Sequence, residues 1–168
     1  ILINNAGIQR RAPLAEMTEA QWREVLDANL TSVFLVARAV APRMIARGAG
    51  KIINTCSVMS EVSRPTIANY AAAKGGVASF SRAVAIEVAD RGITVNAVAP
   101  GAIPTEVMLK ALGKTEDQLD EILAEWKIPL GRLGTPEDIA AACVYLASDA
   151  ASWVSGEIIR VGGGARPR

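Results

Sequence analysis

Short apolar segments recur along the chain without the strict polar–apolar alternation of a half-exposed strand. Such segments are typical of strands that are buried on both faces of a parallel sheet. Longer stretches between them carry apolar residues at helical spacing. The pattern predicts strands within 1–7, 51–57, 93–101 and 156–164, helices at 17–48, 68–91 and 136–148, and weaker, more polar helical pieces within 105–127.

The first helix carries the clearest local signals. Thr18 and Gln21 form a capping box at its start, and Gly48 ends it. The apolar positions between these two points form a stripe that we expect to face the core: Trp22, Val25, Leu26, Val33, Val36 and Val40. Asn29 falls on the same stripe, where an amide without partners would cost about 1–3 kcal/mol. It therefore either adjusts the helix locally or serves a site.

Strands that alternate with helices in this order predict crossover connections and a parallel sheet. We therefore expect an α/β fold, a Rossmann-like doubly wound parallel sheet of about four strands with flanking helices. The 168 residues are few enough for one domain, and no internal repeat or linker divides them.

Composition narrows the function classes. The 18 basic and 17 acidic residues are interspersed, so the charge pattern indicates no nucleic-acid or membrane-surface partner, and no apolar run is expected to span a membrane. Histidine is absent, which excludes histidine-based triads and most catalytic zinc sites, and no metal site is predicted. Cys56 and Cys143 lack motif spacing and are interpreted as free thiols of a cytoplasmic protein.

Three predicted strands end in small or polar residues: Asn4 to Gly7, Ser57, and Pro100-Gly101. In an open parallel sheet, ligands bind outside the carboxyl ends of the strands. Tyr70 and Lys74 begin the helix that follows Ser57, so they belong to the same edge. Topology alone therefore predicts that these side chains converge.

Tyr70 and Lys74 share one helical face, four residues apart. A phenol has a reference pKa of about 10, and a neighbouring ammonium is expected to lower the Tyr70 pKa. Tyr70 would then exchange a proton with an alcohol or a ketone, and Ser57 would hydrogen-bond the same oxygen. The alternative stays open here, since Tyr-x-x-x-Lys also occurs in helices without catalytic function and Ser57 is also an ordinary loop residue.

Taken together, these motifs resemble the short-chain dehydrogenase/reductase family over essentially the whole chain. They are Asn-Asn-Ala-Gly, an asparagine in the next helix, a serine thirteen positions before the tyrosine, Tyr-x-x-x-Lys, and Pro-Gly with a threonine after it. The resemblance implies an oxidoreductase that interconverts a secondary alcohol and a ketone with NAD or NADP. It further implies that Tyr70 is the acid/base, that Lys74 lowers the Tyr70 pKa and binds the nicotinamide ribose, that Ser57 orients the substrate oxygen, and that Asn29 holds a water that links Lys74 to solvent. Cofactor-binding positions would be Asn5, Ala6, Gly7, Tyr70, Lys74, Pro100, Gly101, Ile103 and Thr105.

Within the family, NNAGIQRR and CSVMSE are most similar to gluconate 5-dehydrogenases, which interconvert gluconate and 5-keto-gluconate. Arg10 and Arg64 would then pair with the carboxylate of a sugar acid, and Glu61 would bond its hydroxyls. Solvated loop charges are an equally weighted interpretation for Arg10 and Arg64, and the favoured one for Arg11. Acyl-carrier ketones, polyols and steroids remain alternative substrates.

The chain contains no glycine-rich strand–turn–helix before its first strand, which is where the family binds the pyrophosphate. We therefore expect residues 1–168 to be the C-terminal part of one Rossmann-type domain, and to be inactive alone. The family resemblance implies a homo-oligomer, a dimer or tetramer, for the full-length enzyme. The other interpretation is a non-catalytic interaction module that keeps only the helical contact surfaces.

Overall fold

The computed structural model describes residues 1–165, so the last three residues of the predicted 1–168 domain lie outside the described range. Within that range, one parallel sheet has the order β1-β2-β3-β4, formed by Leu2–Asn4, Gly50–Thr55, Ile93–Pro100 and Ile158–Val161. Leu2 pairs with Ile52, and Ala97 pairs with Ile158. Strands that follow one another in the sequence are therefore neighbours, and all their carboxyl ends meet at one edge.

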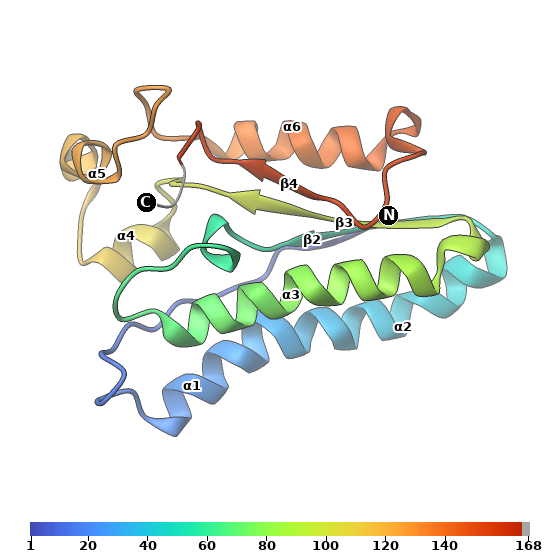
Figure 1. The fold of residues 1–168 in the computed structure, drawn as a ribbon, viewed down its shortest axis with the longest axis horizontal. Coiled ribbons are helices and arrows are strands. Elements are labelled where there is room, and N and C mark those ends of the chain that lie inside the picture. Colours follow the sequence, from blue (N-terminus) through green and yellow to red (C-terminus); the bar gives the residue numbers. More distant parts are fainter. Residues whose placement is uncertain (166–168) are drawn as a thin grey trace.

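Helices cover both faces of the sheet, as the predicted α/β architecture requires (Figure 1). One face carries three of them: α1 (Glu19–Leu26), α2 (Ser32–Arg47) and α3 (Ala68–Glu87). The opposite face carries α6 (Pro136–Ala147), and two short helices lie beyond the carboxyl ends of the strands: α4 (Glu106–Leu112) and α5 (Leu119–Trp126). The Rossmann-like fold class is confirmed.

The apolar core explains why the strands lack alternation. Ile52 and Ile53 are adjacent in β2 and both are buried, although their side chains must point to opposite faces. Ile52 packs in the cluster that contains Met44 of α2, whereas Ile53 packs in the cluster that contains Leu146 of α6. A strand covered on both faces needs apolar residues at consecutive positions.

The first helix differs from its prediction at one turn. A π-helical turn spans Asp27–Thr31 between α1 and α2, with Asn29 at its centre. A π turn adds a residue to the helical turn, and this rotates every later position around the axis. After the turn Val33 is buried as expected and Ala37 is buried as well, while Val36, expected in the core, is 42% exposed. Trp22, which lies before the turn, was also expected in the core and is 37% exposed. Periodicity in the sequence could not reveal the π turn, because the stripe of 3.6-residue period is drawn for a regular helix.

Residues Glu19–Arg47 are long and apolar enough to cross a membrane by length and composition, contrary to the expectation that no segment is. In the structure this run forms α1, the π turn and α2, and its buried positions Val33 and Met44 belong to core clusters. A core helix that lies against a sheet passes the same test of length and composition.

The remaining bounds are close to the prediction. Helix α3 stops at Glu87, a short 3-10 turn covers Ala89–Arg91, and Gly92 follows with a left-handed φ of 69°. Gly92 is required there for a second reason: a Cβ would lie 2.3 Å from the carbonyl oxygen of Gly48. The final strand is shorter than predicted.

Candidate active site

A cavity of about 390 Å³ opens at the carboxyl edge of the sheet. Its lining comes from the loops that follow β1, β2 and β3 and from helices α3 to α6. Among the predicted site residues, the lining includes Asn5, Gly7, Ser57, Arg64, Tyr70, Lys74, Pro100, Gly101, Ile103 and Thr105. The parallel topology therefore brings these side chains together, as was predicted from their positions at the ends of the strands.

Lys74 is the most tightly placed of these groups. It is 4% exposed, and its Nζ donates a hydrogen bond to the Thr55 carbonyl oxygen at 2.6 Å. Thr55 in turn donates through Oγ1 to Asn5 Oδ1, which ties the ends of β1 and β2 together. One turn earlier in α3, the Tyr70 ring lies with its centroid 5.8 Å from Lys74 Nζ. The ammonium and the phenol thus share one wall of the cavity.

Burial dominates the titration of this pair. Desolvation lowers the Lys74 pKa from 10.5 to about 8, because the charged ammonium loses water. Desolvation also raises the Tyr70 pKa, and the neighbouring Ser57 hydroxyl opposes this only in part. The sequence-based expectation of a lowered Tyr70 pKa is therefore not met, because burial of the phenol is the largest influence on it.

Ser57 is held by the local turn that follows β2. Its backbone is extended, and its Oγ accepts a hydrogen bond from the Met59 amide at 3.1 Å, which caps the 3-10 turn Val58–Ser60. The side chain is buried and lines the cavity beside Tyr70. We refer to Ser57, Tyr70 and Lys74 as the tyrosine cluster.

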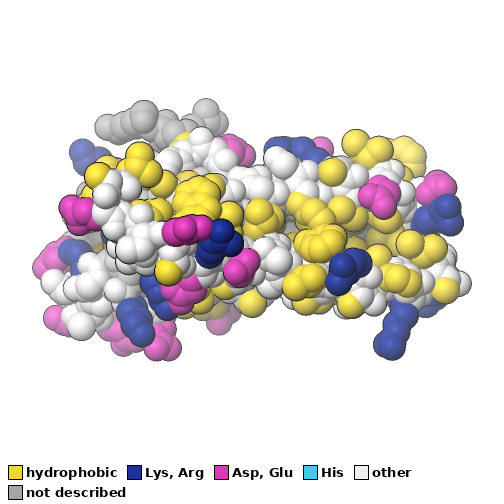
Figure 2. All heavy atoms as spheres, turned by 90° about the horizontal axis from the view of Figure 1, so that it is seen from below, with side chains coloured by type: hydrophobic (Ala, Val, Ile, Leu, Met, Phe, Trp, Pro, Cys, Tyr) yellow, Lys and Arg dark blue, Asp and Glu magenta, His cyan; other side chains and the backbone are white. Residues whose placement is uncertain are grey.

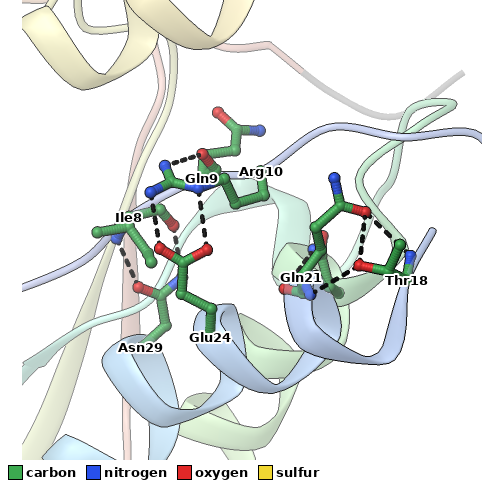
Figure 3. Close-up of polar contacts among 8 residues, drawn as sticks. Ile8, Gln9, Arg10, Thr18, Gln21, Glu24 and Asn29 are labelled. Carbon is green, nitrogen blue, oxygen red and sulfur yellow. Dashed lines mark hydrogen bonds and ion pairs between the residues drawn. The ribbon is translucent and has the colours of Figure 1, made fainter.

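Asn29 supports the site from behind the cavity wall. The amide is fully buried: its Oδ1 accepts from the Ile8 amide at 2.7 Å, and its Nδ2 donates to the Ile8 carbonyl at 2.8 Å (Figure 3). The π turn directs Asn29 toward this loop. Gly7 lies close to the same amide: a Cβ at this position would be 3.1 Å from Asn29 Oδ1 and 3.6 Å from Lys74 Nζ.

The predicted cofactor positions divide by place. Asn5, Gly7, Pro100, Gly101, Ile103 and Thr105 line the cavity, whereas within residues 1–165 Ala6 lies outside the lining set. Thr105 also begins α4, where its Oγ1 accepts from the Met108 amide. The Lys74 ammonium fits the ribose of a nicotinamide coenzyme, and the residues at the end of β3, Pro100 and Gly101, fit its flat ring.

The predicted substrate residues are only partly brought to the cavity. Arg10 binds Glu24 through Nε at 3.0 Å and Nη2 at 2.7 Å (Figure 3), and Glu61 pairs with Arg160 of β4. Within residues 1–165, neither Arg10 nor Glu61 is part of the cavity lining. Each is instead paired with a residue of opposite charge, so the structure does not bring these two to the cavity lining.

Arg64 does line the cavity, and so does Arg11, for which the sequence favoured a solvated role. The Arg64 guanidinium lies 3.7 Å from the centroid of the Trp126 ring, and Nη1 donates to Glu125 at 3.0 Å. Arg11 donates through Nε to Thr66 Oγ1 at 2.9 Å. Sequence reasoning missed Trp126, since a tryptophan at the end of a weak helix gave no signal of proximity to Tyr70.

The chain is similar to known proteins over nearly all its length. A family model described as enoyl-(acyl carrier protein) reductase matches residues 1–166. Gluconate 5-dehydrogenase of Gluconobacter oxydans is 43% identical over 167 residues, which are 98% of this chain and 63% of that protein. A 3-oxoacyl-[acyl-carrier-protein] reductase of Vibrio cholerae is 46% identical over 164 residues, 98% of this chain and 65% of that protein.

A solved structure agrees with the fold. The crystal structure of a gluconate 5-dehydrogenase from Burkholderia cenocepacia, in complex with NADP and tartrate, superimposes with a TM-score of 0.90 at 45% identity. The match covers 98% of this chain and 63% of that one. This chain therefore spans just under two thirds of the length of the relatives it matches.

Proposed function

The chain belongs to the short-chain dehydrogenase/reductase family, and on this premise we propose that its protein is an NAD(P)-dependent oxidoreductase that interconverts a secondary alcohol and a ketone. The observation that carries the proposal is the tyrosine cluster, with Ser57, Tyr70 and Lys74 on one cavity at the carboxyl edge. A non-catalytic module would have no need of that cluster.

The chain's own residues handle the proton and the orientation of the substrate. The Tyr70 phenolate takes the alcohol proton during oxidation, and the Tyr70 hydroxyl returns it to the ketone oxygen during reduction. The Ser57 hydroxyl hydrogen-bonds the same oxygen and holds it against Tyr70. Lys74, fixed by the Thr55 carbonyl, holds its ammonium one turn from Tyr70, where a positive charge would offset part of the cost of forming a buried phenolate.

A nicotinamide coenzyme, NAD or NADP, supplies the hydride chemistry when it is bound. Asn5, Ala6 and Gly7 would contact its adenosine side, and Pro100, Gly101, Ile103 and Thr105 would contact the nicotinamide and phosphate side, with Lys74 at the ribose. The NADP in the Burkholderia relative supports this class of coenzyme. Residues 1–168 alone are expected to lack turnover, because they include no glycine-rich turn for the pyrophosphate.

The substrate we propose is a sugar acid such as gluconate or 5-keto-gluconate. The support is the similarity to gluconate 5-dehydrogenases and the presence of Arg64 on the cavity wall. The second candidate is a 3-oxoacyl thioester on a carrier protein, favoured by the similarity to the Vibrio reductase. A cavity lined by Met59, Met108 and Ile139 would suit an acyl chain.

The protein is proposed to be a cytoplasmic homo-oligomer, and exposed apolar side chains on the face covered by α1, α2 and α3 support the oligomer. Figure 2 shows hydrophobic side chains gathered along this face. They include Phe34, Leu35 and Ile45 of α2 and Ile86 of α3, all at least 37% exposed. Sedimentation of the protein expressed from its complete reading frame is expected to give a dimer or tetramer.

The test is an assay of that same protein, followed by coenzyme absorbance, with NAD or NADP for gluconate and sorbitol and with NADH or NADPH for a 3-oxoacyl thioester. We expect turnover of gluconate to exceed that of sorbitol, a neutral polyol of the same length. Equal turnover of both would remove the sugar-acid assignment and leave the alcohol–ketone assignment. Turnover of a 3-oxoacyl thioester alone would select the second candidate, and no turnover with any of the three would overturn the proposal.

A further inference from the structure

Three arginine–glutamate pairs lie near the carboxyl edge: Arg10–Glu24, Arg64–Glu125 and Arg160–Glu61. Of these residues, only Arg64 lines the cavity. Arg10 and Glu24 have side chains that are 45% and 46% exposed, and both Arg10 Nε and Nη2 are used in the pair. Arg64 and Glu125 have side chains that are 30% and 55% exposed, and Arg64 lines the cavity with Tyr70. The second pair therefore has access to whatever Tyr70 binds.

The Arg64 guanidinium is oriented but only partly used. Stacking on Trp126 at 3.7 Å fixes one face of its plane, so its N–H groups are directed outward along the edges. Nη1 donates to one oxygen of Glu125 at 3.0 Å, and within residues 1–165 no hydrogen bond is formed by Nε or Nη2. A guanidinium in this state can still bind a planar carboxylate through two parallel hydrogen bonds.

Arg11 adds a second positive charge to the same wall. Its Nε bonds Thr66 Oγ1, and the Ala12 amide bonds the Thr66 carbonyl at 3.0 Å, so the two loops are held together. Arg11 and burial both lower the Arg64 pKa, while Glu125 raises it. Arg11, Arg64, Glu125 and Trp126, here called the arginine cluster, thus combine two guanidinium charges with one carboxylate.

We propose that Arg64 and Arg11 form a subsite for the carboxylate of the substrate, and that the Glu125 carboxylate is an internal competitor for that subsite. This rests on the proposed function and deepens it, because it identifies which groups select an acid over a neutral polyol. A substrate carboxylate replaces Glu125 at Arg64 and forms two parallel hydrogen bonds where Glu125 forms one.

The exchange is energetically accessible. An exposed ion pair with a single contact contributes less than about fivefold to an equilibrium, so releasing Glu125 to water is cheap. Two parallel charge-assisted hydrogen bonds to the partly buried Arg64 guanidinium contribute more, about ten- to a hundredfold. Removing the competing charge should therefore tighten acid binding, while removing Arg64 should weaken it.

The experiment is calorimetric titration of gluconate into the protein expressed from its complete reading frame, with NADPH present so that gluconate is not oxidised. Glu125→Gln is expected to tighten gluconate binding about two- to fivefold. Arg64→Ala is expected to weaken it about ten- to a hundredfold, and Arg64→Lys by a smaller factor because the charge remains. Glu24→Gln makes the matched change in the Arg10–Glu24 pair, which does not line the cavity, and it should leave gluconate affinity unchanged.

Titration with sorbitol separates charge from shape, since none of these variants should alter its binding by more than about twofold. Glu125→Gln binding gluconate no more tightly than Glu24→Gln would overturn the proposal. So would an Arg64→Lys variant that folds and binds gluconate as the unsubstituted protein does. The subsite is judged by binding and the proposed function by turnover. Tighter binding in Glu125→Gln without gluconate oxidation would therefore retain the subsite and reject the function.

Discussion

The tyrosine cluster and the arginine cluster line the same cavity but are built differently. Ser57 and Lys74 are buried, and each is held by backbone groups of the turn and strand beside it. Arg64 and Glu125 are partly exposed and are held by each other and by a stacked ring. One set is fixed by main chain, the other by an exchangeable ion pair.

This structural difference explains how one cluster can transfer the proton while the other selects the substrate carboxylate. Proton transfer needs atoms held within a few tenths of an ångström, which backbone contacts of the Lys74 kind provide. Selection of a carboxylate needs a charge that can change partners as substrate enters and leaves. Variants of the first set should therefore alter turnover, and variants of the second set should alter affinity for acids.

The largest effect is expected for Tyr70→Phe, which removes the proton donor and acceptor and little else. Turnover of gluconate should fall about 10²- to 10⁴-fold, with coenzyme binding retained. Tyr145→Phe on α6, outside the set of lining residues described, is the matched control and should keep its activity. Retention of more than a few per cent of the rate by Tyr70→Phe would show that another group moves the proton.

Lys74→Met should stabilise the fold at neutral pH, because it removes a buried charge. The Lys74 pKa is about 8 in the folded chain and 10.5 as its ordinary value, so the unfolded state binds more protons between these values. The destabilisation of the fold by the buried Lys74 charge is therefore complete below pH 8, becomes smaller as the pH rises, and is lost above pH 10.5. Its magnitude is at most about 3 kcal/mol.

Urea unfolding at pH 7 and at pH 10 measures this effect as the difference between Lys74→Met and the unsubstituted protein. The difference should narrow at the higher pH, whereas the exposed change Lys110→Met should give no such trend. A difference that stays constant with pH would show that the ammonium is not the source.

Gly7→Ala tests how closely the β1 loop must approach the site. The new methyl would lie 3.1 Å from Asn29 Oδ1, so the loop must shift by a few tenths of an ångström. We expect turnover to fall about tenfold, by displacement of Asn29 and Lys74. Gly75→Ala, where a Cβ would meet only the Ser60 carbonyl at 3.8 Å, is the control in steady-state assays. Equal activities would show that the loop tolerates the shift.

The smallest effect is expected for Arg10→Ala, although the sequence placed Arg10 with the substrate. Arg10 is paired with Glu24 and, within residues 1–165, is not one of the residues that line the cavity. The KM for gluconate should therefore change less than about twofold. The lost ion pair should cost under about 1 kcal/mol in unfolding free energy. A tenfold rise in KM would return Arg10 to the substrate site.

The fold was predictable because its signals are local and consistent. Non-alternating runs such as 51–57 predict doubly covered strands, and the capping residue Thr18 begins α1 where expected. The π turn at Asp27–Thr31 was not predictable, since its benefit is the pair of hydrogen bonds between Asn29 and Ile8. These join residues twenty-one positions apart in sequence, beyond any periodic pattern.

The tyrosine cluster was predictable for a similar reason: strand ends and the first turn of the next helix meet wherever the sheet is parallel. The arginine cluster was not, because the partner of each arginine depends on tertiary placement. Arg64 meets Glu125 and Trp126 some sixty positions away, whereas Arg10 meets Glu24 nearby. Spacing in the sequence does not distinguish these two outcomes.

The central claim is that the tyrosine cluster performs the chemistry and the arginine cluster selects the acid. Calorimetric titration of gluconate, with NADPH present, into Tyr70→Phe, Arg64→Ala and the double variant tests it directly. We expect less than about fivefold weakening for Tyr70→Phe, more than about tenfold for Arg64→Ala, and additive effects in the double variant. Weakening that is greater for Tyr70→Phe than for Arg64→Ala would contradict the division.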